Sequence, residues 1–420
     1  MNIAIIGAGW AGCAAAVEAT RLGHQVTIFE ASRTAGGRAR RVMATLNGLP
    51  VALDNGQHIL IGAYAETLRL MKDVGVDEKA AFLRLPLTMR FPDGSGLTLP
   101  DWPAPLDAVA GIATASGWSL ADKLSLLKVA LSWRLGGFTC PPGQSVSDLC
   151  RSLAPGPMAW LIEPLCVSAL NTPPERACGQ VFLRVMRDAL FAQSGGSNLL
   201  LPRTDLSALL PDAALAWLEK HGGVQRLGVR VQSLSPAGSG WAVDSEIFDR
   251  VLLACPPMEA ARLVTGSGEP AAEWLALARS LKYEALSTVY AHAPGARLRQ
   301  PMLALRAHAD EPAQFAFDRA QFGGPAGLLA FVISASTGDS ATLTRQVLAQ
   351  AARQLGLKGL QPVQTIVEKR ATFACTPSLQ RPAQQIANGL LACGDYIAGP
   401  YPATLEGAVR SGLEAARSMR

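Results

Sequence analysis

The sequence predicts an α/β fold in which a Rossmann-type nucleotide-binding domain is interleaved with a second, α+β domain. Three observations predict this class. A strand–turn–helix–strand pattern fills the first 30 residues, a strand followed by a small-residue helix returns at 390–412, and 420 residues are too many for one ordinary core. We therefore expect the two ends of the chain to build one domain and long central segments to build the other.

The N-terminal segment has the pattern of a βαβ unit that binds a dinucleotide. An apolar run at 3–6 leads into the glycine-rich turn at 7–12, and a helix is expected over 14–22. A second apolar run at 25–29 ends on Glu30. Because strand, turn, helix, second strand and terminal acid all agree, the pattern is more specific than a glycine turn alone.

Each glycine of this turn has a distinct physical role. Gly7 allows the tight turn, Gly9 lets the backbone approach a pyrophosphate, and Gly12 lets helix and strand pack without a Cβ between them. The free N–H groups and the positive dipole end of the helix favour the diphosphate. Glu30 is expected to accept hydrogen bonds from the adenosine ribose.

Two further segments indicate that the dinucleotide is FAD. A glycine pair ending at Gly37 is followed by Arg38, which suits a second approach to a diphosphate with a charge-assisted donor. Near the C-terminus, a buried strand at 390–393 ends in Gly394 and Asp395, and a loop then enters a small-residue helix. A second helix N-terminus aimed at the cofactor suits a flavin ring, which gains negative charge on reduction. NAD enzymes have no need of this element.

The domain division follows from where these patterns stop and resume. We expect the FAD-binding domain to comprise 1–62, 205–262 and 385–420, and the substrate-binding domain to comprise 63–204 and 263–384. The first central segment begins with a helical pattern and the second alternates strand and helix patterns, so both are expected to fold as α+β structure.

The composition narrows the class of partner. Hydrophobic residues make up 49% and charged residues 17%, which favours a large lipophilic cavity or a membrane-facing surface. No apolar run reaches about 18 residues, so no transmembrane helix is expected, and no export signal is expected at the N-terminus. The eight scattered cysteines predict free thiols in a reducing cytosol and no metal site, and a net charge of +5 is too diffuse to indicate nucleic acid.

One helix admits two interpretations. Ser119 and Asp122 form a capping-box pattern, after which leucines recur at helical spacing through Leu135. With Trp118, Trp133 and basic residues alongside, the helix suits the surface of an anionic membrane. The same leucine stripe is typical of a helix that packs on a core.

The residues at both ends resemble the flavin-containing amine oxidase superfamily, which includes phytoene-type desaturases. Within it, the segments 54–64 and 394–408 are most similar to the hydroxysqualene dehydroxylase family, also described as squalene-associated FAD-dependent desaturases. The resemblance covers essentially the whole chain and implies a two-domain fold like that of p-hydroxybenzoate hydroxylase. It also implies reduction of hydroxysqualene to squalene in hopanoid or related triterpene biosynthesis, functional coupling to the synthase that makes the substrate, and peripheral contact with the cytoplasmic membrane.

The resemblance also assigns site residues. Gly7, Gly9, Gly12, Glu30, Gly37 and Arg38 match the ADP-binding positions, and Val231 matches a strand residue whose backbone contacts adenine. Asp395 matches the acid that contacts ribityl or phosphate, and Thr404, Leu405 and Glu406 match the residues under the flavin ring. Many amine oxidases use two aromatic rings beside the flavin, and only Tyr401 has an obvious place here, which weakens an amine-oxidase assignment.

The chemistry requires a proton donor as well as a hydride. Reductive loss of an allylic hydroxyl needs an acid, since hydroxide is a poor leaving group, and a dry apolar cavity. His58 and Tyr401 are the candidates, because both fall in segments expected to flank the ring. The alternative for His58 is that it holds its loop by hydrogen bonds together with Asp54, and for Tyr401 that it only packs.

Other functions remain open at this stage. Within the superfamily the alternatives are a carotenoid-type desaturase, in which hydride travels the other way and a base is needed, or an amine oxidase. From a different class, the protein is a flavin-binding isomerase of the pyranose-mutase type or a scaffold without redox turnover. Basic residues lining the cavity would favour a nucleotide sugar, whereas an apolar lining would favour a terpene.

Overall fold

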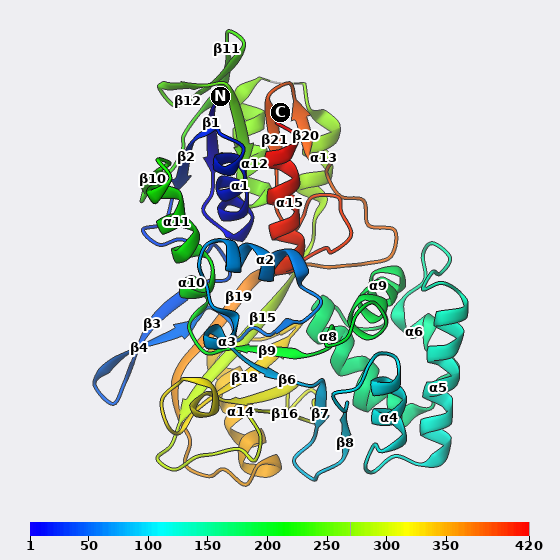
Figure 1. Cartoon of the computed structure of the whole chain (residues 1–420). Helices are drawn as coiled ribbons and strands as arrows, with labels where there is room; N and C mark the ends of the chain where they lie inside the picture. The colour runs from blue at the N-terminus through cyan, green and yellow to red at the C-terminus, as the bar shows by residue number, and fades with distance from the viewer. Residues whose placement is uncertain (269, 420) are drawn as a thin grey trace.

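The computed structural model describes residues 1–268 and 270–419 and is built on two separate sheets. Figure 1 shows a largely parallel sheet with both chain termini in the upper half and a second sheet with several helices in the lower half. This confirms the predicted α/β class of interleaved two-domain flavoproteins. The residue boundaries given above remain our proposed division.

The upper sheet has six strands in the order β10-β2-β1-β14-β21-β20. Their bounds are β10 (Val224–Leu227), β2 (Gln25–Glu30), β1 (Asn2–Ile6), β14 (Arg250–Leu253), β21 (Leu390–Ala392) and β20 (Gln385–Ala387). Only β20 pairs antiparallel. Three distant stretches of chain therefore meet in one sheet, as expected for a domain that the chain leaves and re-enters.

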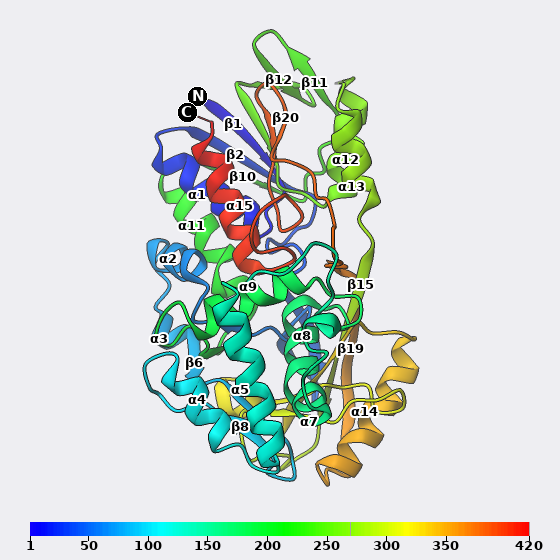
Figure 2. The same cartoon turned by 90° about the vertical axis from the view of Figure 1, so that its right-hand side faces the viewer.

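Helices cover both faces of this sheet, because alternate side chains of each strand point to opposite faces. Ile3 and Ile5 of β1 pack beneath α1 (Trp10–Arg21), α11 (Pro211–Lys220) and α15 (Leu405–Arg417). The opposite face carries α12 (Pro257–Ser267), α13 (Ala272–Ser280) and a small sheet of β11 (Leu234–Ala237), β12 (Gly240–Val243) and β13 (Glu246–Phe248). Figure 2 shows α1 and α15 side by side.

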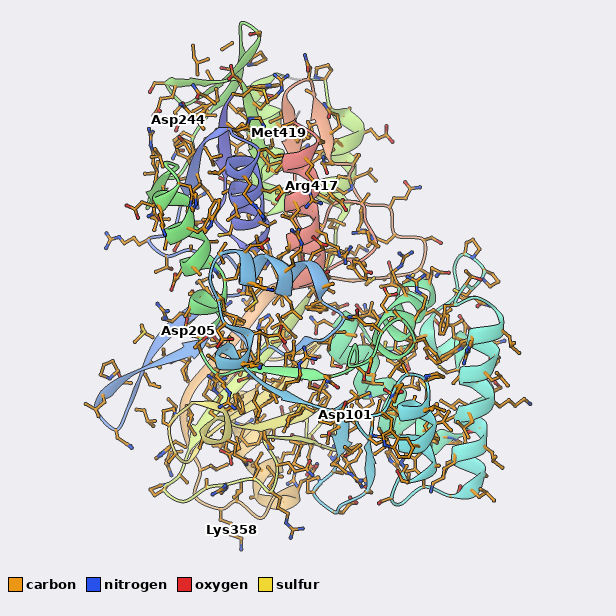
Figure 3. The ribbon with its side chains drawn as sticks, in the orientation of Figure 1. Asp101, Asp205, Asp244, Lys358, Arg417 and Met419 are labelled. Carbon is orange, nitrogen blue, oxygen red and sulfur yellow. The ribbon has the colours of Figure 1, made fainter. Side chains whose placement is uncertain are left out.

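Helix α15 is held against α1 by close packing and by one ion pair. A Cβ on Gly412 would lie 2.2 Å from the carbonyl oxygen of Ala11, so the helices approach as closely as a glycine permits. Arg417, labelled in Figure 3, donates through Nε to a carboxylate oxygen of Glu18 at 2.6 Å. The start of α15 is thereby fixed relative to the turn that begins α1.

The lower sheet is antiparallel, with the order β16-β17-β18-β15-β19. Its strands are β16 (Met302–Ala304), β17 (Phe315–Asp318), β18 (Leu328–Ser334), β15 (Tyr283–His292) and β19 (Gln361–Phe373). Helix α14 (Ser340–Gln354) covers one face. The other face contributes Tyr290, Phe317 and Val332 to a core shared with the helical segment.

The remaining elements connect and cover these sheets. The helices are α2 (Ala65–Asp73), α3 (Glu78–Ala81), α4 (Leu106–Ala113), α5 (Leu120–Leu135), α6 (Val146–Leu149), α7 (Pro155–Pro157), the π-helix η1 (Met158–Ile162), α8 (Glu163–Leu170), α9 (Gly179–Leu190), α10 (Leu206–Leu209) and the 3₁₀-helix η2 (Arg319–Phe322). The strands are β3 (Arg41–Leu46), β4 (Leu49–Asp54), β5 (Leu60–Ile61), β6 (Phe82–Leu85), β7 (Thr88–Arg90), β8 (Gly96–Thr98) and β9 (Leu199–Pro202). Across 1–268 and 270–419, no helix combines the length and apolar character needed to cross a membrane.

Two local expectations need correction. Val231 was matched to a strand residue, but β10 ends at Leu227 and β11 starts at Leu234, so Val231 lies in an irregular segment. The capping box at Ser119 and Asp122 is present, yet the tryptophans beside α5 do not face outward. Trp118 is buried, and the Trp133 ring packs edge-on against Phe182 of α9 with their centroids 6.0 Å apart.

Candidate functional site

A cavity of about 1000 Å³, here called the central cavity, runs from the glycine turn at 7–12 toward the lower sheet. The turn after β1, the start of α15, the segment 57–64, helices α8 and α9 and the lower sheet all contribute to its wall. Every predicted cofactor residue except Gly12 lines it, as do His58 and Tyr401. Their proximity is a property of the structure, whereas their roles remain our proposals.

The glycines of the first turn leave one surface of the cavity free of side chains. Gly9 has the extended backbone of a helix N-cap, and a Cβ there would find no atom nearer than the Gly37 Cα at 3.9 Å. A Cβ on Gly37 would lie 3.3 Å from the Gly9 Cα, so the two glycines face each other. Gly36 fixes this arrangement by donating its N–H to the carbonyl of Ala8 at 2.8 Å. A groove between two bare backbones suits a diphosphate.

The other glycines of this turn serve packing. Gly7 has φ +114°, a left-handed conformation that favours glycine, and a Cβ would lie 2.6 Å from the carbonyl oxygen of Ala254. A Cβ on Gly12 would lie 1.9 Å from the carbonyl oxygen of Gly7. Gly12 thus lets α1 pack on β1 and does not itself reach the cavity.

The adenosine end is marked by an acid and by a free backbone donor. The Glu30 carboxylate accepts N–H bonds from Ala8 and Ser32, each at 2.8 Å, which places it at the C-terminal end of β2. The Val231 carbonyl accepts a hydrogen bond from Arg262 at 2.8 Å. The Val231 N–H has no partner among the described residues, so it can still contact an adenine although it lies outside a strand.

Arg38 and Asp395 form an ion pair in the cavity wall. The Arg38 guanidinium donates to Asp395 Oδ1 at 2.5 Å and to the carbonyl oxygen of Ala371 at 2.6 Å. Asp395 is nearly buried. The pair joins the glycine turn at 36–37 to the strand end at β21, which are the two places where the sequence predicted contact with the cofactor.

The N-terminus of α15 faces the cavity. Thr404 is its N-cap, and its hydroxyl accepts the Gly407 N–H at 2.9 Å. Glu406 was expected under the flavin ring, but its buried carboxylate turns the other way and accepts the N–H groups of Glu66 and Thr67 at 3.1 and 2.9 Å, capping α2. Arg410 donates to the same carboxylate at 2.6 Å.

His58 is held in one orientation. Its Nδ1 lies 2.6 Å from the carbonyl oxygen of Gly56, a distance that places the ring proton on Nδ1 because a carbonyl only accepts. Nε2 has no hydrogen-bond partner among the described residues, and His58 lines the cavity. Burial lowers the pKa of His58, the Gly56 hydrogen bond raises it and the Arg38 charge lowers it, with a net shift below 6.5. His58 is therefore neutral at pH 7 and offers Nε2 as an acceptor.

Tyr401 differs from the packing aromatic that sequence alone allowed. Its hydroxyl donates to Asp188 of α9 at 2.9 Å, and the Arg410 guanidinium lies 4.9 Å from the ring centroid. Burial raises the pKa of Tyr401, and the hydrogen bond to Asp188 and the Asp188 charge raise it further. Tyr401 thus holds its proton more tightly than a free tyrosine and joins the C-terminal loop to α9.

A buried polar network supports the segment that carries His58, and sequence patterns did not reveal it. Arg319 donates to the Gln57 side-chain oxygen at 3.0 Å and lies 4.0 Å from Asp54 Oδ2. That Asp54 oxygen is buried without a hydrogen-bond partner, while the other accepts the Leu206 N–H at 2.7 Å. Burial raises the pKa of Asp54 to about 6. These residues are far apart in sequence, so no motif could have joined them.

The remainder of the cavity wall, beyond the predicted cofactor residues, is mainly apolar. Asp188 is the one acid that α8 and α9 contribute to it, and it was missed because no motif surrounds it. The apolar side chains here come from the 59–61 segment, the 87–89 segment, α8, α9, β9 and the lower sheet: Ile59, Ile61, Leu87, Met89, Leu165, Ala169, Val185, Met186, Leu190, Leu199, Leu286, Met302, Phe315, Phe317 and Val332.

These features fit FAD. The facing glycines leave room that a single Cβ would fill, the Val231 N–H is unpaired, and the α15 N-terminus suits a ring that gains negative charge. Across 1–268 and 270–419, no three His, Cys, Asp or Glu side chains are grouped to hold a metal. Fold and site together define an FAD-dependent oxidoreductase.

Comparisons with known proteins place the chain in a family. The model for flavin containing amine oxidoreductase matches residues 10–420. Hydroxysqualene dehydroxylase of Rhodopseudomonas palustris is 30% identical over 99% of this chain and 97% of its own length. The enzyme of the same name from Sinorhizobium fredii is 27% identical over the same shares. An oxidoreductase from Methanosarcina mazei, 17% identical, has the same fold over 100% of both chains with a TM-score of 0.73. The chain thus belongs to the flavin containing amine oxidoreductases, in one family with these hydroxysqualene dehydroxylases.

Proposed function

We propose that this protein reduces hydroxysqualene to squalene, with the allylic hydroxyl leaving as water. The observation that carries the proposal is the apolar lining of the central cavity beyond its cofactor residues. A hydrocarbon chain gains from leaving water along such a wall, whereas a nucleotide sugar or a diamine would lose hydrogen bonds there. The names of the two relatives above agree with this substrate.

His58 is the proton donor in this proposal. His58 lines the cavity and its Nε2 has no partner among the described residues, whereas the Tyr401 hydroxyl is bonded to Asp188. The lowered pKa of His58 makes its protonated form a strong acid, and the raised pKa of Tyr401 makes that phenol a weak one. Protonation by His58 would let the carbon–oxygen bond break with water as the leaving group. The chemistry that FAD would supply when bound in its reduced form is hydride donation to that carbon.

The surrounding residues orient His58 and exclude water. The Gly56 carbonyl fixes the ring through Nδ1–H, so Nε2 is the position that takes up the catalytic proton and then donates it. Gln57, held by Arg319, closes the wall beside it. Phe315, Phe317 and Met302 cover the cavity from the lower sheet, so that developing positive charge on an allylic carbon meets no competing nucleophile.

One observation favours a second function, oxidative desaturation of a polyene. His58 is neutral at pH 7 and therefore better suited to accept a proton than to donate one. Hydride would then pass from substrate to oxidised FAD and the proton to His58. The same apolar wall would hold a carotenoid precursor.

Anaerobic single-turnover experiments test the proposal. Reduced protein mixed with hydroxysqualene in detergent should reoxidise as squalene appears, with a diamine as the control that leaves the flavin reduced. Oxidised protein mixed with phytoene should stay oxidised. Reduction of the flavin by phytoene, with no squalene from hydroxysqualene, would overturn the proposal in favour of desaturation.

The proposal extends to the setting of the enzyme. We infer that it works on the inner face of the cytoplasmic membrane and is functionally coupled to the synthase that makes its substrate. A product with few polar groups dissolves poorly in water, so direct passage along or within the bilayer avoids its release.

A further inference from the structure

An exposed apolar surface lies on α4 and α5, on the side of the lower half that faces the viewer in Figure 2. In the described part of the chain fifteen large apolar side chains are strongly exposed, and seven of them fall between residues 102 and 135. We call these seven the α4–α5 face: Trp102, Leu106, Val109, Leu120, Leu124, Leu131 and Leu135. Patches of this kind on a soluble surface mark a site of interaction.

The leucines of α5 form a stripe that the fold leaves uncovered. Leu120, Leu124, Leu131 and Leu135 are 72%, 56%, 56% and 79% exposed. The opposite side of the helix packs on the core, and Leu126 and Val129 are buried there. Packing inside this chain therefore gives no reason for the exposed leucines.

Basic residues accompany the stripe without acidic partners. Lys128 lies between Leu124 and Leu131 at helical spacing and Arg134 adjoins Leu135, and neither makes an ion pair among the described residues. Asp122 is bound to Ser119 in the capping box, and Asp107 is buried. Asp101, labelled in Figure 3, is the exposed acid nearest in sequence to Trp102. The free charge on α5 itself is positive, which suits an anionic surface.

We propose that the α4–α5 face docks on an anionic lipid bilayer, with the leucines in the acyl–headgroup boundary and Lys128 and Arg134 at the phosphates. Exposed leucines between unpaired basic residues are the pattern of an interfacial helix. A soluble protein partner or a second copy of this chain would be a different occupant, and the experiment below separates them.

The docked face lies close to the central cavity. The Trp133 ring of α5 packs on Phe182 of α9, and Val185 and Met186 one turn along α9 line the cavity. The α4–α5 face is thus connected to the central cavity through α5 and α9, which pack directly on each other. This step rests on the proposed function, because it gives a lipid substrate a short route into the cavity.

Vesicle flotation of the FAD-loaded full chain tests the proposal. Holoenzyme should float with vesicles of phosphatidylglycerol and phosphatidylcholine and should bind phosphatidylcholine alone at least about 10-fold more weakly. Replacing Leu124, Leu131 and Leu135 with glutamine should lower binding at least about 10-fold. Glutamine keeps the helix propensity of leucine, and flavin content should not change.

A matched variant and a second assay make the result decisive. Met43, Leu49 and Ile247, exposed to similar degrees elsewhere, are replaced with glutamine as the control and should leave binding unchanged. Equal binding by both triple variants, or loss of a dimer by the leucine variant in size exclusion without any flotation, would overturn membrane docking. Turnover of hydroxysqualene in detergent is measured separately, so a wrong substrate would leave the flotation result standing.

Discussion

Replacing Gly9 with valine is expected to remove FAD without unfolding the protein. Gly9 has φ −75° and ψ −179°, which any residue adopts, and the nearest heavy atom to a Cβ there is 3.9 Å away. The added Cβ therefore clashes with no part of the protein. It projects instead toward Gly37, into the groove where a diphosphate would approach the backbone.

The magnitude follows from the contacts that the valine would displace. We expect a diphosphate in this groove to accept about two charge-assisted hydrogen bonds from backbone N–H groups, each contributing about 1.5–3 kcal/mol. Losing both costs about 3–6 kcal/mol, so the dissociation constant of FAD should rise roughly 10²–10⁴-fold.

The assay compares flavin content with folding. Gly9→Val should purify without the flavin absorbance of the wild-type protein but with an unchanged circular dichroism spectrum. Gly266→Val is the control, because that exposed helical position has no heavy atom within 4 Å of a Cβ and lies far from the cavity wall. A Gly9→Val protein that retains full flavin content would refute the placement of the diphosphate.

Two other predictions concern protons. Because the pKa of His58 is lowered, its protonated fraction keeps rising as the pH falls from 8 to 6.5, so reoxidation of the flavin by hydroxysqualene should accelerate up to about 10-fold per pH unit in this range. His58→Gln should flatten this profile and slow the step about 10²–10⁴-fold, whereas Tyr401→Phe should keep the profile. A flat profile of the wild-type protein would exclude His58 as the acid. The pKa of Asp54 is raised from 3.8 to about 6, so its contribution to stability is present below about pH 4 and is lost as pH rises through 6, an effect of about 3 kcal/mol. Asp54→Asn should not show this loss in flavin-monitored thermal unfolding between pH 4 and 7, and equal pH dependence in both proteins would contradict the assignment.

The features that could be predicted from the sequence are those whose physical requirement is local. The conformation of the glycine turn depends only on residues adjacent in sequence, so the roles of Gly7, Gly9 and Gly12 could be predicted. In the structure a Cβ would clash at Gly7 and Gly12 and would enter the groove at Gly9, as those roles require. The ends of the chain could be joined because a dinucleotide of known length needs contacts at both of its ends. The FAD-binding architecture was correctly predicted for this reason.

Features that depend on distant partners could not be predicted in this way. Residues 120–135 are apolar on more than one side, so periodicity could not tell which side meets the core, and the fold turned Leu126 and Val129 inward. Trp133 looked like a membrane anchor because its partner Phe182 lies in another helix. Asp188 is not part of a recognisable sequence motif, and it became a candidate site residue only because the structure shows its hydrogen bond to Tyr401.

Glu406 shows that resemblance alone does not establish what a side chain does, because its role depends on the residues that surround it in the fold. A carboxylate in the first turn of α15, if it faced the cavity, would oppose the negative charge that a flavin ring gains on reduction. Here the carboxylate satisfies the N–H groups of Glu66 and Thr67 and pairs with Arg410, so its charge stabilises the start of α2. The N-terminus of α15 is thereby left with the Thr404 hydroxyl and its own positive dipole end toward the cavity. One side chain thus links two helices and keeps the electrostatics of the cofactor site favourable, which neither segment of sequence could have indicated alone.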